Sequence, residues 1–353
     1  KAVSVKADAT LVVPIGGMVE KGGDAAAFVT IDGGGVGVAE VSAISGNVDS
    51  APCASSSSDH WYFAGGSTQE HDVMAVSIAN PTSSTAVANL TLTTTDGLVV
   101  PGEGQGIVLA PHGVASLTLN SLAPHRDAVG AIVSATKGSV VSTMTRSRGT
   151  PGGDSIVLGA PSLESHLMLP AAVASPGATM TLSVSNPTLS DQKVTVTARI
   201  ASGQLSPWTQ SVPARSIWNL TISPTSRVPL TSVYSLEVTS SGPGVAAELE
   251  LLASRATTAG LSNVVLTNGS SFTAGRWLLS ATSSDPASLV FGATTNRSVT
   301  LHVARLGAQG PQAVAGLDGT VIKGNGTLEA TAAQLARLGG HPLLIWADGP
   351  LAT

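Results

Sequence analysis

The histidines are the residues of this chain most suited to binding a metal ion or acting as general bases. They are His60, His71, His112, His125, His166, His302 and His341. None has the His-x-His or His-Glu-x-x-His spacing that brings two ligands to one ion, and Cys53 is the only cysteine that could join them. His60, His71 and Asp72 come nearest to a ligand group. Solvated loop histidines explain the pattern equally well, so we expect no metal site and no cofactor.

A nucleophilic serine is the second candidate. Gly153-Asp154-Ser155-Ile156 resembles the nucleophile block of GDS-type esterases. That chemistry also needs an oxyanion donor and a base from a downstream Asp-x-x-His, and no such sequence follows. The block lies in a Gly/Pro-rich stretch, residues 146–166, that we interpret as a connector. We therefore expect no enzyme; an esterase would need a base within hydrogen-bond reach of Ser155.

Two glutamates form a possible carboxylate pair. Glu248 and Glu250 alternate with Leu249 and Leu251, which places both acids on one face of a strand. The positions 106 residues earlier hold Ser142 and Met144, so the acids are not part of a repeated unit. A half-exposed strand explains the alternation without catalysis.

Tryptophans are the best candidates for contacting a ligand. Trp208 follows Ser206-Pro207 on an expected loop, and Trp218 is a second aromatic nearby. Carbohydrate-binding sandwiches use exposed aromatic faces as stacking platforms. Trp208 and Trp218 are therefore the candidate ligand-binding residues, with a core or inter-domain anchor as the alternative.

The composition excludes several classes of partner. Charged residues make up 11% of the chain and the net charge is −5, whereas nucleic acids and anionic membranes call for clustered Lys and Arg. No run approaches the roughly 18 apolar residues of a membrane span. The single cysteine, Cys53, can form no internal disulfide. The chain begins at Lys1 without an apolar signal core, so we expect a mature or trimmed chain that lacks its targeting segment.

The elements that carry these residues are organised as a tandem repeat. Val76-Ser77-Ile78-Ala79-Asn80-Pro81-Thr82 returns as Leu182-Ser183-Val184-Ser185-Asn186-Pro187-Thr188. Three landmark pairs are each 106 residues apart: Asn80 and Asn186, Gly97 and Gly203, Trp61 and Leu167. A degraded third copy begins at Trp277, which is 110 residues after Leu167. Asn296, which is 110 residues after Asn186, stands in place of its Asn-Pro pair. A period of this size indicates an array of similar domains.

Short alternating segments give each repeat its predicted strands. In the first repeat they are Trp61–Phe63, Met74–Ala79, Ala86–Thr95, Gly106–Leu109, Val114–Leu119, Val129–Ala135 and Ser139–Thr145. Seven short strands joined by tight turns are typical of an immunoglobulin-like sandwich. The second repeat begins at Leu167 and closes with strands Val233–Thr239 and Val245–Leu252, and a further connector covers Ser254–Phe272.

The Asn-Pro pairs have a structural explanation. Proline keeps the preceding residue extended, and an asparagine amide can satisfy backbone groups in the turn that follows. We therefore predict that Asn80 with Pro81, and Asn186 with Pro187, form structural turns that end a strand, in preference to a ligand-binding asparagine.

Both ends of the chain differ from the repeat. Residues 1–60 contain β-rich runs at Ala7–Gly16, Ala26–Ile31 and Val36–Ile44, followed by an expected linker at Pro52–Asp59. The third repeat has predicted strands at Ser288–Thr294, Ser298–Ala304 and Pro342–Ala347 and a predicted helix at Ala330–Leu338. It ends two residues into its expected last strand. We consider two explanations, a shortened chain or a sheet completed by a segment from residues 1–60.

A family resemblance rests on Trp61-Tyr62-Phe63-Ala64-Gly65-Gly66, Ala79-Asn80-Pro81, Leu158-Gly159-Ala160-Pro161 and Ser185-Asn186-Pro187. With these sequences the chain resembles a family of uncharacterised exported actinobacterial proteins, a domain of unknown function, over roughly residues 50–260. The Ala, Gly, Val and Thr bias, with Arg outnumbering Lys, fits a high-GC host. The third repeat departs from the family in having Asn296-Arg297 for Asn-Pro. The resemblance implies an envelope location and brings no catalytic residues.

We therefore predict an all-β chain of three tandem immunoglobulin-like β-sandwich domains with an N-terminal β extension. The predicted divisions are residues 1–60, 61–150, 151–260 and 261–353. The expected function is that of a non-enzymatic structural or interaction module of the bacterial cell envelope, extracellular or on the cell surface, with an envelope protein or glycan as partner. The alternative is a carbohydrate-binding accessory protein of an envelope glycosyltransferase or hydrolase. Fold alone decides neither function.

Overall fold

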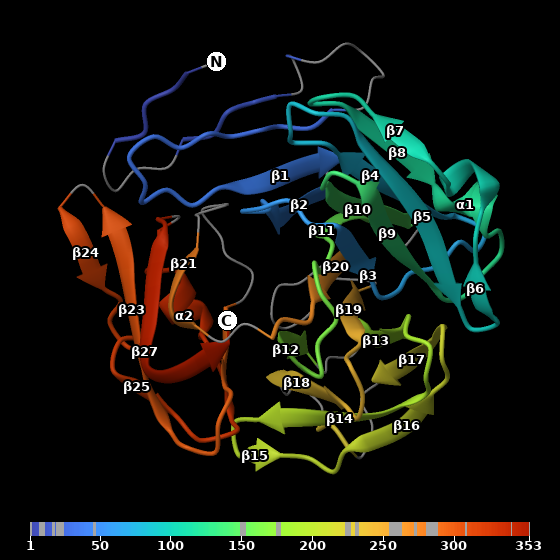
Figure 1. Ribbon diagram of the computed structural model, residues 1–353. Helices are drawn as coiled ribbons and strands as arrows, with labels where there is room; N and C mark the ends of the chain where they lie inside the picture. Colours follow the sequence, from blue (N-terminus) through green and yellow to red (C-terminus); the bar gives the residue numbers. More distant parts are fainter. Residues whose placement is uncertain are drawn as a thin grey trace.

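The computed structural model describes residues 2–6, 11–15, 18, 25–44, 47–148, 153–173, 178–222, 227–229, 233–253, 263–271, 274–279, 289–307, 309–339 and 341–352. Over these residues the chain is all-β and is built from several antiparallel sheets, as the sequence predicts (Figure 1). We call residues 60–158, 166–268 and 274–352 the first, second and third units. No helix in the described part is long and apolar enough to cross a membrane.

The first unit consists of two facing sheets. One contains β3 (His60–Phe63), β5 (Ala86–Thr94), β6 (Gly97–Val99), β7 (Ile107–Leu109) and β9 (Val129–Lys137). The other contains β4 (Asp72–Ala79), β8 (Val114–Thr118), β10 (Val141–Arg148) and β11 (Asp154–Leu158). A 3-10 turn, η1 (Gly102–Gly104), and a short helix, α1 (Leu119–Leu122), connect strands. In β5 Ala88, Leu90 and Leu92 are buried in the core, as the period of two requires.

The second unit follows the same plan. Its first sheet contains β12 (His166–Val173), β14 (Gln192–Ile200), β15 (Gly203–Gln204), β16 (Trp208–Val212) and β18 (Val233–Ser240). Its second contains β13 (Ala178–Asn186), β17 (Ser216–Ile222), β19 (Ala246–Ala253) and β20 (Asn263–Asn268). Leucines and valines from both sheets form its core.

The third unit has fewer strands in the described part of the chain. They are β21 (Ala274–Leu279), β22 (Val290–Ala293), β23 (Val299–Gly307), β24 (Gly310–Ala313), β25 (Thr320–Ile322), β26 (Thr327–Glu329) and β27 (Leu343–Ala352). The helix predicted at Ala330–Leu338 is limited to α2 (Ala332–Leu335), because the residues after it form turns up to Gly339.

Strand pairing repeats from unit to unit. β3, β12 and β21 open the units and pair with β9, β18 and β27, which in turn pair with β5, β14 and β23. The opening landmarks of the three units, which are 106 and 110 residues apart, occupy one position in this pattern. Trp61 pairs with Val133, Leu167 with Val238 and Trp277 with Ile345. The offsets seen in the sequence therefore correspond to equivalent places in the sheets.

The last residues of β27 reach a further strand of the same sheet. Leu351 and Ala352 pair with Ala293 and Gly292 of β22, and earlier residues of β27 pair with β21 and β23. Val141 makes the corresponding pair with Ala79 in the first unit. The start of a strand equivalent to β10 is therefore present in the third unit.

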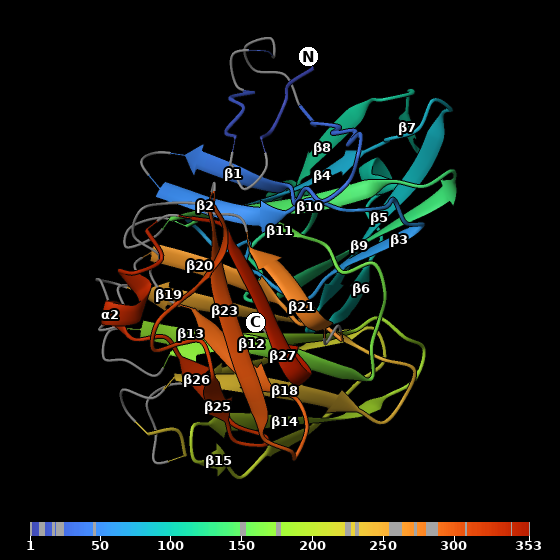
Figure 2. The same ribbon diagram turned by 90° about the vertical axis from the view of Figure 1, so that its left-hand side faces the viewer.

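The first two units are joined through a continuous sheet. Ser216 of β17 pairs in parallel with Thr94 of β5, which links strands from both units into a nine-stranded sheet. Figure 1 shows the first unit above the second and the third to their left, and Figure 2 brings the third unit to the front. The second unit contacts both of the others.

Several sequence predictions were wrong about the connecting segments. The connector expected at residues 146–166 contains β11, which pairs with β10, and the connector expected at Ser254–Phe272 contains β20, which pairs with β19. Both segments are rich in glycine or polar residues, but the strand that precedes each of them in the chain supplies its hydrogen bonds. Part of each connector, residues 149–152, 254–262 and 272, lies outside the described residues.

The N-terminal extension was also predicted incompletely. Of its three expected β-rich runs, the described residues of the last form β1 (Ala39–Ile44), which pairs with β2 (Asn47–Pro52). Residues 25–31 are exposed and form no strand, and residues 7–10 and 16 lie outside the described part. The Asp49 Oδ2 atom accepts a hydrogen bond of 2.8 Å from the Ile156 amide of β11. Within the described residues β1 and β2 pair with each other and do not complete the third unit's sheet.

Candidate functional site

The glutamates of β19 lie at the interface between the first and second units. Leu249 and Leu251 point into the core of the second unit, so alternation turns Glu248 and Glu250 the other way. That face meets Arg146, which β10 presents on the same side as the buried Met144. The half-exposed strand predicted for these acids is wrong, because the side chain of Glu248 is only 1% exposed.

Five charged side chains form an alternating chain across this interface, which we call the interface ion chain. Its members are, in order, Glu248, Arg146, Glu250, Arg148 and Asp72 of β4. Arg146 pairs with Glu248 through Nη2, and its Nη1 atom lies 3.4 Å from Glu250 Oε2. Arg148 reaches Glu250 Oε1 at 3.0 Å and Asp72 Oδ1 at 3.3 Å. Each interior charge therefore has two partners of opposite sign.

Burial changes along the ion chain. Glu248 and Arg146 are buried, whereas the side chain of Arg148 is 27% exposed. A cavity of about 10 Å³, room for roughly one water molecule, adjoins Asp72, Arg148 and Glu250. Burial raises the pKa of Glu248 to about 7 and outweighs the nearby Arg146 charge, which lowers that pKa.

Two glycines let the backbone pass over the ion chain. A Cβ atom at Gly65 would lie 2.1 Å from Ser183 Oγ of the second unit, and one at Gly66 would lie 3.0 Å from Arg146 Nε. Gly66 also has a φ of +148°, which side chains rarely tolerate. The Ala64-Gly65-Gly66 segment therefore forms a close contact that larger residues would prevent.

A second polar network joins the second and third units. Arg199 of β14 is buried and pairs with Glu237 Oε2 of β18 at 2.6 Å, while His166 Nε2 lies 2.7 Å from Glu237 Oε1. Arg199 Nη1 donates to the Ala293 carbonyl of the third unit at 3.1 Å. Thr327 Oγ1 of β26 donates to the Arg199 carbonyl at 2.9 Å. A buried arginine therefore takes part in the contact of the second unit with each of its neighbours.

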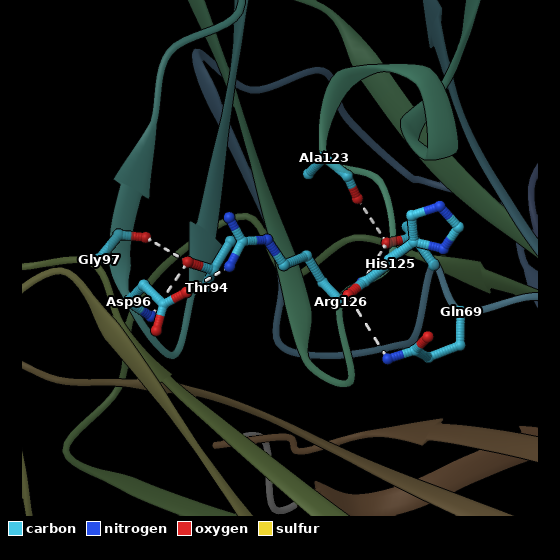
Figure 3. A network of polar contacts seen from close by, with 8 residues as sticks. Gln69, Thr94, Asp96, Gly97, Ala123, His125 and Arg126 are labelled. Carbon is cyan, nitrogen blue, oxygen red and sulfur yellow. Dashed lines mark hydrogen bonds and ion pairs between the residues drawn. The ribbon is translucent and has the colours of Figure 1, made fainter.

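Side-chain hydrogen bonds also hold the loops at one end of the first unit (Figure 3). Arg126 forms an ion pair with Asp96, in the turn where Thr94 Oγ1 donates to the Gly97 carbonyl at 2.9 Å. Gln69 Nε2 donates to Asp127 Oδ1 at 2.7 Å. These contacts connect three loops that are remote in sequence. We call residues 67–71, 94–97 and 123–127 the loop cluster.

The candidate tryptophans do not form an open platform. Trp208 begins β16, so its predicted place on a loop is wrong, and it is half-buried against the core of the second unit. The Arg227 guanidinium carbon lies 4.8 Å from the centre of its ring. Trp218 lies on β17, opposite Val184, and is half-buried against the same core. A cation–π contact and the core account for the surroundings of Trp208.

The asparagines of the Asn-Pro pairs are buried at strand ends. Asn80 Nδ2 donates to the carbonyls of Ser84, Leu109 and Ala110, and its Oδ1 accepts from the Thr82 amide at 3.0 Å. Asn186 makes the matching bonds to Ser190, Val212, Pro213 and Thr188, and Pro81 and Pro187 follow as half-buried residues.

The counterpart expected at Asn296 was wrong. Asn296 is exposed, and the residue that follows β22, as Asn80 follows β4, is Thr294.

The other residues considered for catalysis or metal binding do not come together into a site in the described part of the chain. Ser155 is buried on β11, and its Oγ has no hydrogen-bond partner in the described structure, so no base is within reach. Among the described residues no three His, Cys, Asp or Glu side chains converge on a metal position. His60 pairs with Asp59, and His71 lies beside Glu70 at the surface. Cys53 is exposed.

Comparison with known families bears on the same part of the chain. A family of unknown function, DUF5719, matches residues 38–233, which is more than half of the sequence. The chain belongs to DUF5719. The predicted resemblance to an uncharacterised domain is thereby confirmed. The DUF5719 match includes Asp72, Arg146 and Arg148 but ends before Glu248 and Glu250.

Other comparisons add little to the DUF5719 assignment. No curated protein matches the chain. Among solved structures, the α-L-rhamnosidase of Streptomyces avermitilis complexed with L-rhamnose is similar at 10% identity with a TM-score of 0.16. The alignment covers 82% of this chain and 41% of the rhamnosidase chain, so this chain spans less than half of that enzyme.

Proposed function

We propose that this protein is a non-enzymatic interaction module of the bacterial cell envelope, in which three immunoglobulin-like sandwiches present loops and edge strands to a protein or glycan partner. The observation that carries the proposal is that a buried arginine connects the second unit to a neighbour on each side. Arg146 of the first unit pairs with Glu248, and Arg199 donates a hydrogen bond to the Ala293 carbonyl of the third unit. Domains in one chain ordinarily move relative to each other unless their interface is large. Ion-paired interfaces and a shared sheet favour a fixed spacing.

The loop cluster is the surface that we propose for presentation. Its three loops are fastened to one another by side-chain hydrogen bonds, so a partner would meet a surface that needs little ordering. An export route and an envelope location rest on the family resemblance and the low-charge composition.

A protein partner is better supported than a carbohydrate. The ring of Trp208 packs on the core and is approached by Arg227, which leaves less of it to stack on a sugar.

The proposal is tested by offering the purified protein a panel of envelope glycans, peptidoglycan fragments, and ester and glycoside substrates. We expect no turnover and the same glycan profile for the wild type and Trp208→Ala. Turnover that Ser155→Ala abolishes would contradict a non-enzymatic role. Glycan binding that Trp208→Ala abolishes would favour the carbohydrate-binding alternative.

A second arm tests presentation itself. A photo-crosslinker at Glu70, an exposed position of the loop cluster, should capture one defined envelope component on intact cells. The same crosslinker at the exposed Val321 of the third unit is the matched control. Equal labelling from both positions would contradict a partner site at the loop cluster.

A further inference from the structure

The interface ion chain carries an unbalanced charge. It contains three carboxylates, Asp72, Glu248 and Glu250, but only two guanidiniums, Arg146 and Arg148. A buried charge without a partner is costly, and a carboxylate can avoid that cost by taking up a proton. One member of the ion chain therefore gains by becoming neutral.

Geometry identifies that member as Glu248. Glu250 has both guanidiniums as partners and Asp72 lies toward the solvent, whereas Glu248 has only Arg146 and is the most buried of the three. The donors that approach the Glu248 carboxylate are the Arg146 guanidinium and the Ala64 backbone amide. An ionised carboxylate that is almost fully buried beside one guanidinium is less well compensated than Glu250, which has two.

We propose that the interface between the first and second units binds a proton on Glu248, so that this contact is strengthened at mildly acidic pH and weakened above neutral pH. The cavity beside Asp72 and Arg148 is also lined by Arg146, the ion-pair partner of Glu248. The proposal concerns the interface alone and stands whether or not the protein presents loops to an envelope partner.

The groups that face Glu248 determine the sign of the effect. Arg146 from β10 and the backbone amide of Ala64 lower its pKa, whereas burial, the largest cause, and Glu250 on the same strand raise it, to about 7. Ser183, opposite Glu248 on β13, is uncharged. A raised pKa means that the folded state binds the proton more tightly than the unfolded chain. The added stability is complete below about pH 4.5, the ordinary value for a glutamate, and is lost as the pH rises through about 7.

Glu248→Gln is the direct test, because glutamine imitates the neutral carboxyl group. The measurement is the opening equilibrium of β10 and β19 amides by hydrogen exchange, corrected for the intrinsic rate, from pH 5 to pH 8. The opening constant of the wild type, relative to that of Glu248→Gln, should rise by up to about tenfold per pH unit between pH 5 and 7 and then level off. Taking the ratio removes contributions from Glu40 and Asp49, whose pKa values burial also raises.

Glu250→Gln is the matched control, since Glu250 holds both arginines and should be needed in its charged form. It should loosen the interface at pH 5 and pH 8 alike. If Glu248→Gln did the same, Glu248 would be ionised in the fold and the proposal would be wrong. An infrared band of a protonated buried carboxyl group at pH 5, absent at pH 9, tests the wild type directly if a variant does not fold; absence of the band at pH 5 would also overturn the proposal.

Discussion

At the scale of single residues, buried asparagines do more for this fold than any candidate catalytic group. Asn80 and Asn186 each donate to three backbone carbonyls at the end of a strand. An unsatisfied buried carbonyl costs about 1–3 kcal/mol. The repeated Asn-Pro sequence is thus explained by backbone satisfaction and needs no ligand.

Asn80→Ala should lower the free energy of unfolding by about 3 kcal/mol, because several carbonyls lose their donor at once. Urea unfolding followed by tryptophan fluorescence measures the change. Asn296→Ala is the matched control, since Asn296 is exposed, and should change stability by less than about 0.5 kcal/mol. Equal changes in the free energy of unfolding for the two substitutions would show that the buried hydrogen bonds of Asn80 do not stabilise the fold.

At the scale of elements, the strands of neighbouring units approach so closely that small residues decide whether they fit. The contact of the Ala64-Gly65-Gly66 segment with β13 leaves no space for a Cβ atom at Gly65. Close packing of this kind resists added atoms, with a cost of about 1–3 kcal/mol.

Gly65→Ala should therefore destabilise the first interface by about 2 kcal/mol or more, measured as the urea midpoint. Adding Ser183→Gly, which removes the atoms that the new methyl group would meet, should restore part of that loss. Gly102→Ala is the control, because nothing lies within 4 Å of a Cβ atom there. Additive effects of the Gly65 and Ser183 changes would contradict the contact.

The sequence predicts the strands of the first unit and the opening landmarks of all three units well, but it places the third counterpart of the asparagine two residues too late. Alternation in β5 and the Asp96-Gly97 turn are local signals, and a repeat copies them. β11 and β20 were missed because their pairing depends on β10 and β19, not on their own pattern. The interface ion chain was missed for a similar reason. Arg146 and Glu250 are 104 residues apart in the sequence. The sequence indicated only that the two glutamates share one face of a strand.

At the scale of the whole molecule, the second unit is fastened to a neighbour on each side. The nine-stranded sheet and the interface ion chain join it to the first unit, while Arg199 joins it to the third. A module built this way should behave as one body and not as three domains on flexible connections. This rigidity is the central claim, because presentation of loops at fixed positions depends on it.

The distance between two spin labels, measured by pulsed electron paramagnetic resonance, tests that claim most directly. Labels attached to cysteines at the exposed Val108 of the first unit and Val321 of the third, with Cys53→Ser, report on the molecule end to end. We predict one narrow distance distribution, which Arg146→Ala broadens by leaving Glu248 without its partner. A broad distance distribution, or several separate distances, in the labelled protein that keeps Arg146 would contradict the account.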